Sequence, residues 1–139
     1  MNKMVLKSTF SLLNVDYVQL GDNWNYQNVT STFYRIYLID DGNGILYNPS
    51  SSCTLERGFL YMVPSFTTCN YSCADYLSQY YISFIEDAPD GTSLFTYNRR
   101  ILRVPAVPDD VEHFKRILEL NPNRGLQRSE DPRVYEKYP

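Results

Sequence analysis

Few side chains of this protein are suited to acid–base, nucleophilic or metal chemistry. The 139 residues include one His, at position 113, and three Cys, at positions 53, 69 and 73. Sites for zinc and similar metals need several imidazole, thiolate or carboxylate ligands that converge from neighbouring elements. His113 falls in a predicted helix, away from the predicted strands, so we expect no bound metal and no other cofactor. Cys69 has no His that would lower its pKa, which favours a small apolar wall residue over a nucleophile.

Residues suited to binding are more frequent, since the chain contains thirteen Tyr, seven Phe and one Trp. A binding pocket needs only an apolar cavity with a few polar groups that orient the ligand. Successive side chains of a strand point to opposite faces, so Gln79, Tyr81 and Ser83 should share one face. Tyr80, Ile82 and Phe84 should share the other.

Three further residues have two interpretations each. Arg35 lies between apolar neighbours in a predicted strand. It either faces a cavity, where it would meet an anionic or polyhydroxylated ligand, or points outward and pairs with an acid of the next strand. Trp24 and Tyr26 precede the first predicted strand, and they either fold over a pocket mouth or belong to the core or an interface.

The elements that would position these residues are mostly strands. The predicted strands are Phe33–Asp40, Ile45–Tyr47, Cys53–Leu55, Phe59–Val63, Cys69–Cys73, Leu77–Ile85, and two shorter ones near Leu94–Tyr97 and Ile101–Val104. Turn residues such as the stretch 41–44 separate them. Several short strands with no helical pattern between them indicate an antiparallel sandwich or barrel.

One helix is predicted after the strands. The stretch Pro108 to Asp110 supplies a cap and first-turn acids, and a stripe of apolar residues follows: Val111, Phe114, Ile117, Leu118 and Leu120. The stretch 121–123, Asn-Pro-Asn, ends the helix. The rest is polar and resembles a connection to a further region.

Charge and targeting signals narrow the function. The net charge is −3, and the thirteen Lys and Arg are spread along the chain. Duplex DNA binding needs clustered cations, so we expect no DNA binding by this chain alone.

The N-terminus lacks the pattern of a signal peptide, and no segment is long enough to cross a membrane. The odd number of Cys is consistent with reduced thiols, and we expect a cytoplasmic protein.

An ordered set of short motifs resembles a known family. Residues 55–64, Leu-Glu-Arg-Gly-Phe-Leu-Tyr-Met-Val-Pro, combine a turn Gly, an apolar strand and a Pro that ends it. Together with the stretches 24–26, 33–39, 42–44, 64–67, 80–84, 114–122 and 131–135, this hairpin resembles the N-terminal sensor domain of AraC-type transcription regulators, over about Val15 to Tyr138.

The resemblance implies a mainly β, antiparallel, cupin-like (jelly-roll) barrel over residues 1–107, followed by a helix and polar linker over 108–139. A small-molecule effector would bind inside the barrel, and a carbohydrate is one candidate. Positions that hold the sugar in a sugar-responsive member fall on Tyr71, Gln79 and Tyr81, with the first two expected on strands that pair with each other. That member has His in place of Gln79 and Trp in place of Tyr81, so the hydrogen-bonding group differs here.

The ligand-binding candidates are therefore Tyr71, Gln79, Tyr81, Arg35, Trp24 and Tyr26. Where metal-binding cupins carry a His after the Pro, this chain has Cys69, which again indicates no metal. DNA would be bound only by a region beyond this chain, and the full-length protein is expected to be a homodimer without enzymatic activity. Two alternatives stay open: a freestanding cupin-like enzyme such as a sugar-modifying isomerase, and a structural dimerisation module that has lost its ligand.

Overall fold

The computed structural model describes residues 9–30, 32–49, 51–87 and 101–123. This part of the chain forms eight strands and then one helix. They are β1 (Thr9–Gly21), β2 (Asn25–Thr30), β3 (Tyr34–Asn48), β4 (Ser51–Glu56), β5 (Phe59–Val63), β6 (Thr68–Ser72), β7 (Tyr76–Asp87), β8 (Leu102–Pro105) and α1 (Pro108–Leu120). No helix within these ranges is both long and apolar enough to cross a membrane.

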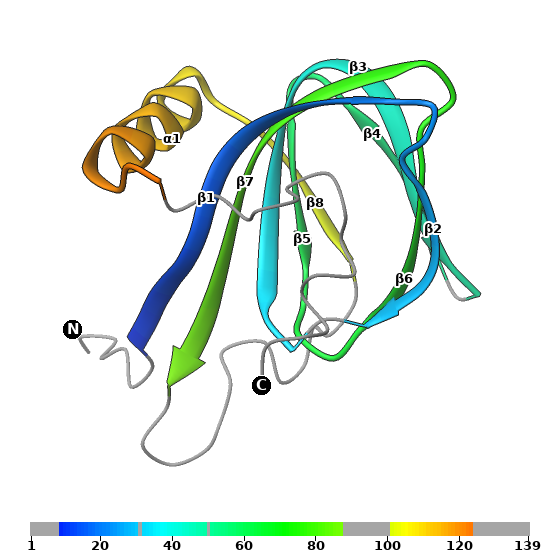
Figure 1. The fold of residues 1–139 in the computed structure, drawn as a ribbon, viewed down its shortest axis with the longest axis horizontal. Coiled ribbons are helices and arrows are strands. Elements are labelled where there is room, and N and C mark those ends of the chain that lie inside the picture. The colour runs from blue at the N-terminus through cyan, green and yellow to red at the C-terminus, as the bar shows by residue number, and fades with distance from the viewer. Residues whose placement is uncertain (1–8, 31, 50, 88–100, 124–139) are drawn as a thin grey trace, which may run out of the picture.

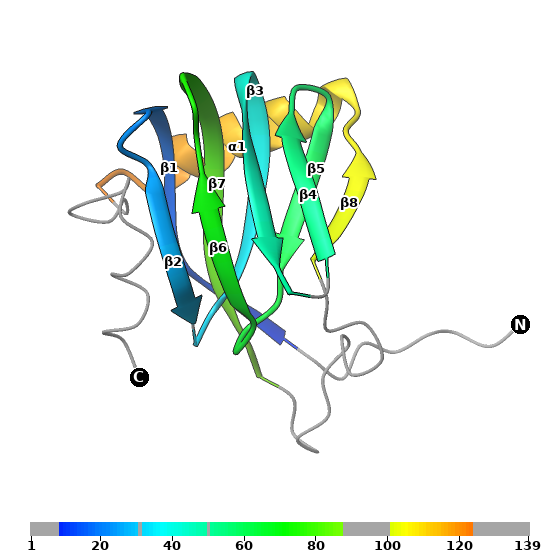
Figure 2. The ribbon, with the colours of Figure 1, turned by 90° about the vertical axis from the view of Figure 1, so that its right-hand side faces the viewer.

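The strands form two antiparallel layers that enclose the core and share β3 (Figure 1). The long layer has the order β1-β7-β3-β5-β8. The short layer consists of β2, β6, the second half of β3, and β4. Figure 2 shows the short layer in front and α1 behind the long layer. The predicted fold class, mainly antiparallel β with a helix after the strands, is confirmed.

The strand β3 belongs to both layers because it bends at Gly42. Residues 34–42 pair with β7, whereas residues 43–48 pair with β4. The register against β7 shifts between Ile39 and Asp41, and Gly42 has a φ of +76°. A Cβ at Gly42 would overlap the backbone carbonyl of Tyr76, so only Gly fits here.

The sequence-based prediction of two strands here, Phe33–Asp40 and Ile45–Tyr47, is therefore wrong. The intervening stretch 41–44 has the composition of a turn, but a bulge next to Gly42 bends the strand without ending its pairing.

Two strands before Phe33 were not predicted. In β1, a register shift between Leu12 and Asn14 interrupts the alternation of apolar and polar residues, which hides the strand pattern. The sequence of β2, Asn-Tyr-Gln-Asn-Val-Thr, is polar and Asn-rich, and its strand conformation comes from pairing with β6. The last described strand is β8, shifted by one residue from the predicted Ile101–Val104. The predicted strand at Leu94–Tyr97 and the tail after Asn123 lie outside the described residues.

The helix α1 begins where the sequence predicts. Pro108 occupies its first turn, and the Asp110 carboxylate accepts a hydrogen bond of 2.8 Å from the backbone N–H of Val107. Phe114 is the buried residue of the helix, and its ring lies 5.8 Å from that of Tyr80 on β7. This contact holds α1 against the outer face of the long layer.

Candidate functional site: the inner and outer faces of the long layer

The inner face of the long layer carries the polar residues singled out from the sequence. On β7, Gln79, Tyr81 and Ser83 are at most 2% exposed. Their partners on β3 are Ile39, Tyr37 and Arg35, in that order. The three residues of β7 share one face, as alternation predicts, and the structure turns this face and its β3 partners toward the short layer.

Arg35 is the charged group of this interior. It is fully buried, so the interpretation as an outward, solvent-exposed Arg is wrong. Its Nη1 donates a hydrogen bond to the hydroxyl of Tyr71, and its Cζ lies 5.5 Å from the centre of the Tyr71 ring. Burial raises the pKa of Tyr71 well above its usual value, and the Arg35 charge opposes this rise. The Tyr71 hydroxyl is thus neutral and the guanidinium charged at physiological pH.

Two buried polar atoms beside this pair have no hydrogen-bond partner in the part of the chain that the structure describes. They are Oε1 of Gln79 and Oγ of Ser83. Ser83 is the direct cross-strand partner of Arg35, and Gln79 lies four residues along the same strand face. A buried polar atom without a partner costs about 1–3 kcal/mol, so such atoms mark places where a ligand or water completes the structure.

Tyr71 reaches this cluster from the opposite layer. The expectation that Tyr71 and Gln79 approach each other across paired strands is wrong, because β6 pairs with β2 and β3 while β7 pairs with β1 and β3. The connection at Ala74 and Asp75 carries the chain from the short layer to the long layer. Tyr71 and Tyr81 still belong to one buried cluster, because both side chains point between the layers.

Trp24 and Tyr26 close the cluster at its edge. Trp24 is 3% exposed, and its ring lies 5.2 Å from that of Tyr71 in an edge-on arrangement. Tyr26 is half-buried, is the cross-strand partner of Tyr71 and packs against the same core. Trp24 is therefore a core residue, whereas Tyr26 lies at the boundary between core and solvent.

The sequence analysis missed Tyr37 and Ser83 as members of the site. Tyr37 is 3% exposed and lies directly opposite Tyr81 on the neighbouring strand. Burial raises its pKa, and the Arg35 charge opposes the rise. Period-two alternation starting from Arg35 would have found Tyr37, and alternation from Tyr81 groups Ser83 with it.

The reactive side chains do not form a catalytic or metal arrangement within the described ranges. Cys69 is buried, and burial raises its pKa to about 11. His113 is exposed on α1, away from the inner face. Among the described residues, no three His, Cys, Asp or Glu side chains are grouped so that they could hold a metal ion. A metal-free protein stays a prediction, which elemental analysis of the purified chain tests.

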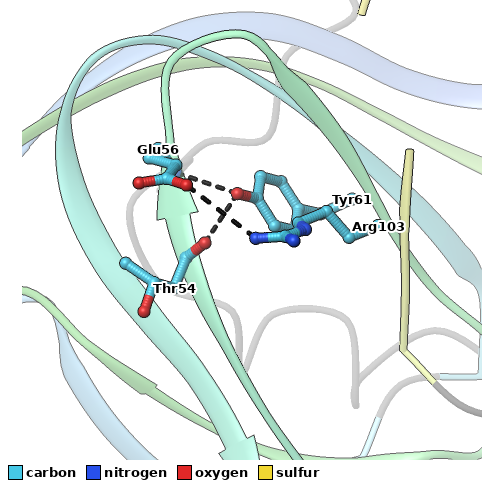
Figure 3. A network of polar contacts seen from close by, with 4 residues as sticks. All are labelled: Thr54, Glu56, Tyr61 and Arg103. Atoms are coloured by element: carbon cyan, nitrogen blue, oxygen red, sulfur yellow. Dashed lines mark hydrogen bonds and ion pairs between the residues drawn. The ribbon is translucent and has the colours of Figure 1, made fainter. Parts of the chain in front are cut away.

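A polar network around Tyr61 connects β4, β5 and β8 (Figure 3). The Tyr61 hydroxyl donates to the carbonyl of Thr54 at 2.6 Å and accepts from the backbone N–H of Glu56 at 3.0 Å. The Glu56 carboxylate forms a 3.8 Å ion pair with Arg103 of β8. The two hydrogen bonds of Tyr61 lie within the β4–β5 hairpin, and the ion pair links this hairpin to the edge strand β8.

The outer face of the long layer has a different character. An apolar groove of about 490 Å³ lies between the sheet and α1, and we call it the outer groove. Its sheet side consists of Phe10, Leu12, Ile36, Met62, Ile82 and Phe84. Ile117 of α1 and Asn121, just after the helix, complete the lining. These residues include no charged side chain.

Aromatic contacts flank the outer groove along the sheet. Toward one side, the Phe84 ring lies 5.5 Å from Phe10 and 5.3 Å from Tyr34. Toward the other, Phe114 rests on Tyr80. The groove is thus a bounded hollow beside the point where the helix is anchored.

Comparisons with known proteins find similarity at the level of structure only. No protein-family model matches the chain, and no curated protein matches its sequence. The apo form of a variant of ToxT from Vibrio cholerae is 12% identical with a TM-score of 0.49, over 96% of this chain and 54% of that one. Unsaturated-fatty-acid-bound ToxT is 14% identical with a TM-score of 0.47, over 99% of this chain and 53% of that one.

The EutQ protein of Clostridium difficile is 14% identical with a TM-score of 0.45, over 55% of this chain and 67% of that one. The chain spans about half the length of the ToxT structures that it matches.

Proposed function

We propose that this domain binds a small molecule between its two β-layers and acts as the effector-sensing part of an AraC-type transcription regulator. The observation that carries the proposal is the row of Arg35, Ser83 and Gln79, which places a buried cation and two buried polar atoms that no described residue satisfies on one inner face. Natural interiors satisfy nearly all such atoms, so their presence favours a ligand that supplies the missing hydrogen bonds.

The aromatic residues around this row fit the same role. The rings of Tyr71 and Tyr81 and the Arg35 guanidinium lie in one buried interior, and aromatic rings together with a cation suit a polyhydroxylated or anionic molecule. Of the six candidate residues, only Tyr26 is more than 3% exposed. We therefore propose that a ligand enters beside β2, by displacement of Tyr26.

A binding role is preferred to an enzymatic one on the chemistry of the side chains. A thiol with a pKa of about 11, as for Cys69, is almost wholly protonated at neutral pH and is a poor nucleophile. The interior thus offers hydrogen bonds and ring faces without an activated nucleophile. Homodimerisation, and DNA binding through a region beyond this chain, belong to the same proposal.

Thermal unfolding with a panel of neutral sugars, small carboxylic acids and hydroxylated aromatic compounds tests the binding site. A ligand at about 100 times its Kd adds about 2.7 kcal/mol of stability, which raises the Tm by several degrees. Gln79→Leu keeps the volume but removes the amide, so it should abolish the shift. Gln19→Leu, on the exposed part of β1, is the matched control and should keep it. A shift that survives Gln79→Leu undiminished contradicts the interior site.

The parent reading frame tests the regulator part separately. We expect it to encode paired helix-turn-helix units downstream of Pro139. A stop codon directly after the codon for Pro139 would contradict a role in a regulator, but it would not contradict ligand binding.

A further inference from the structure

We propose that the outer groove is a second binding site, distinct from the interior, that takes an uncharged apolar small molecule. Its volume of about 490 Å³ lies within the range of about 300–1,000 Å³ that is usual for small-molecule pockets. It has walls from four strands and from α1, so an occupant would be held by the sheet on one side and the helix on the other.

The chemistry of the lining selects the kind of molecule. Among the described residues that line the groove, every side chain except that of Asn121 is hydrocarbon, aromatic or thioether. This described part of the lining holds no charged group that could pair with a carboxylate or an ammonium, so a charged ligand would lose its hydration there without compensation. The Asn121 amide nitrogen donates to the carbonyl of Ile117 at 2.9 Å, which fixes the one polar side chain at the rim. An alcohol, ester, hydrocarbon or similar neutral molecule fits this surface.

The lining also has exposed apolar surface that a bound molecule would cover. Phe10 is 44% exposed although its ring packs on Phe84, and Ile36, Met62 and Ile82 in the middle of the sheet are only partly buried. Removal of apolar surface from water stabilises a complex roughly in proportion to the area that is covered. Because these residues face one hollow, a single molecule would cover all of them at once.

The size of the hollow argues against a helix as the occupant. An α-helix with its side chains is about 10 Å wide, so a volume of about 490 Å³ would hold about one helical turn. One turn buries too little surface to dock stably by itself, whereas a molecule with a ring system or a medium-length alkyl chain fills the space. The structure therefore favours a small molecule over a further helix or a second copy of this chain.

Binding of the uncharged dye Nile red to the 139-residue protein tests this site. We expect saturable binding with one dye per chain and displacement by decanol. Decanoate should compete at least about tenfold more weakly, because its carboxylate finds no cation in the lining.

Two variants locate the dye. Ile117→Asp places a charge in the lining and should weaken Nile red binding at least about tenfold. Leu120→Asp introduces the same charge on the same helix, at a residue that is 62% exposed and outside the lining, and should bind like the wild type. If Ile117→Asp fails to fold, judged by circular dichroism, Met62→Trp replaces it, because the larger side chain fills the groove without adding charge.

Other results would overturn the second site. They include no saturable binding, binding that both groove variants leave unchanged, and decanoate that competes as well as decanol. A second copy of this chain would be the occupant if the wild type self-associates in sedimentation, Ile117→Asp does not, and neither protein binds the dye. Gln79→Leu should not affect Nile red binding, so failure at the groove is distinguishable from failure of the proposed interior site.

Discussion

The two faces of the long layer differ sharply although they share the same strands. Gln79, Tyr81 and Ser83 point inward, where they are sealed between the layers. Ile82 and Phe84 point outward, into a hollow whose described lining residues carry no charge. Because the faces alternate residue by residue, a shift of the register by one position would exchange a polar interior for an apolar one. The pairing of β7 with β1 and β3 thus decides which chemistry each surface offers.

Adjacent residues of β7 give the most direct test of this difference. Tyr81→Ala removes a ring that is 1% exposed and should lower the free energy of unfolding by about 3–5 kcal/mol. Ile82→Ala removes a half-buried side chain beside an existing hollow, and should cost about 1 kcal/mol. Urea unfolding of both variants measures the two losses. Equal losses would mean that the two faces are packed alike. Because Tyr81→Ala should be strongly destabilised, binding studies use Tyr81→Phe, which keeps the ring.

The interior needs both layers and therefore the bend of β3, whereas the outer groove lies between the long layer and α1. Gly42→Ala combines left-handed backbone strain with overlap against Tyr76, and should cost about 3 kcal/mol. Gly58 also has a positive φ, of +94°, but a Cβ there would meet nothing within 4 Å. Gly58→Ala should therefore cost only the backbone strain, about 1–2 kcal/mol. Unfolding in urea separates the two, and a larger loss for Gly58→Ala would contradict the account of the bend.

A pH series examines how strongly the interior excludes charge. Burial raises the pKa of Cys69 from 9.0 to about 11. The unfolded chain then loses its thiol proton at a lower pH than the folded chain does. The contribution of the protonated Cys69 is fully present below pH 9 and is lost as the pH rises toward 11.

Between pH 9 and 11, the free energy of unfolding should fall by about 2 kcal/mol more in the wild type than in Cys69→Ala. The buried Tyr residues titrate in the same direction in both proteins, so only the difference between the two pH profiles is interpreted. Parallel profiles would mean that the Cys69 thiol is hydrated in the folded state.

The smallest effects on the free energy of unfolding are expected in the polar network around Tyr61. Tyr61→Phe removes the hydroxyl that binds Thr54 and the Glu56 amide, and should cost about 1–1.5 kcal/mol. Glu56→Gln breaks only the ion pair with Arg103, whose side chains are about half exposed, and should cost less than about 0.5 kcal/mol. Differential scanning calorimetry compares the two. A larger loss for Glu56→Gln would show that the ion pair, not the buried hydroxyl, holds the hairpin.

Local patterns predicted the strands that obey them. The run around Gln79 and Tyr81 alternates, so the strand and the grouping of its side chains into two faces could be predicted from the residues, whereas the inward orientation of Gln79 and Tyr81 was implied only by the family resemblance. The helix was equally readable, because Pro108 and Asp110 mark its start. By contrast, β1 contains a bulge and β2 is polar, so no local pattern reveals them.

Long-range geometry accounts for the rest. Nothing in the sequence near Tyr71 tells that β6 and β7 belong to different layers, since that depends on the bend of β3 at Gly42. The outer groove was missed for a related reason. Ile36, Met62 and Ile117 are distant in sequence, and each is an ordinary apolar residue until the sheet and helix bring them together.

The pairing of β1 with β7 has a consequence for synthesis of the chain. β1 is made first, but its partner runs from Tyr76 to Asp87, so it cannot pair until most of the described sheet has been translated. At about 5–20 residues per second, the interval between Gly21 and Tyr76 lasts several seconds. During that interval the β1 segment, which contains Leu12, Leu13 and Val15, has no partner strand. Its backbone can pair with other chains before β7 has been translated. The yield of folded protein should therefore depend on how well the ribosome or a chaperone protects the nascent β1 segment.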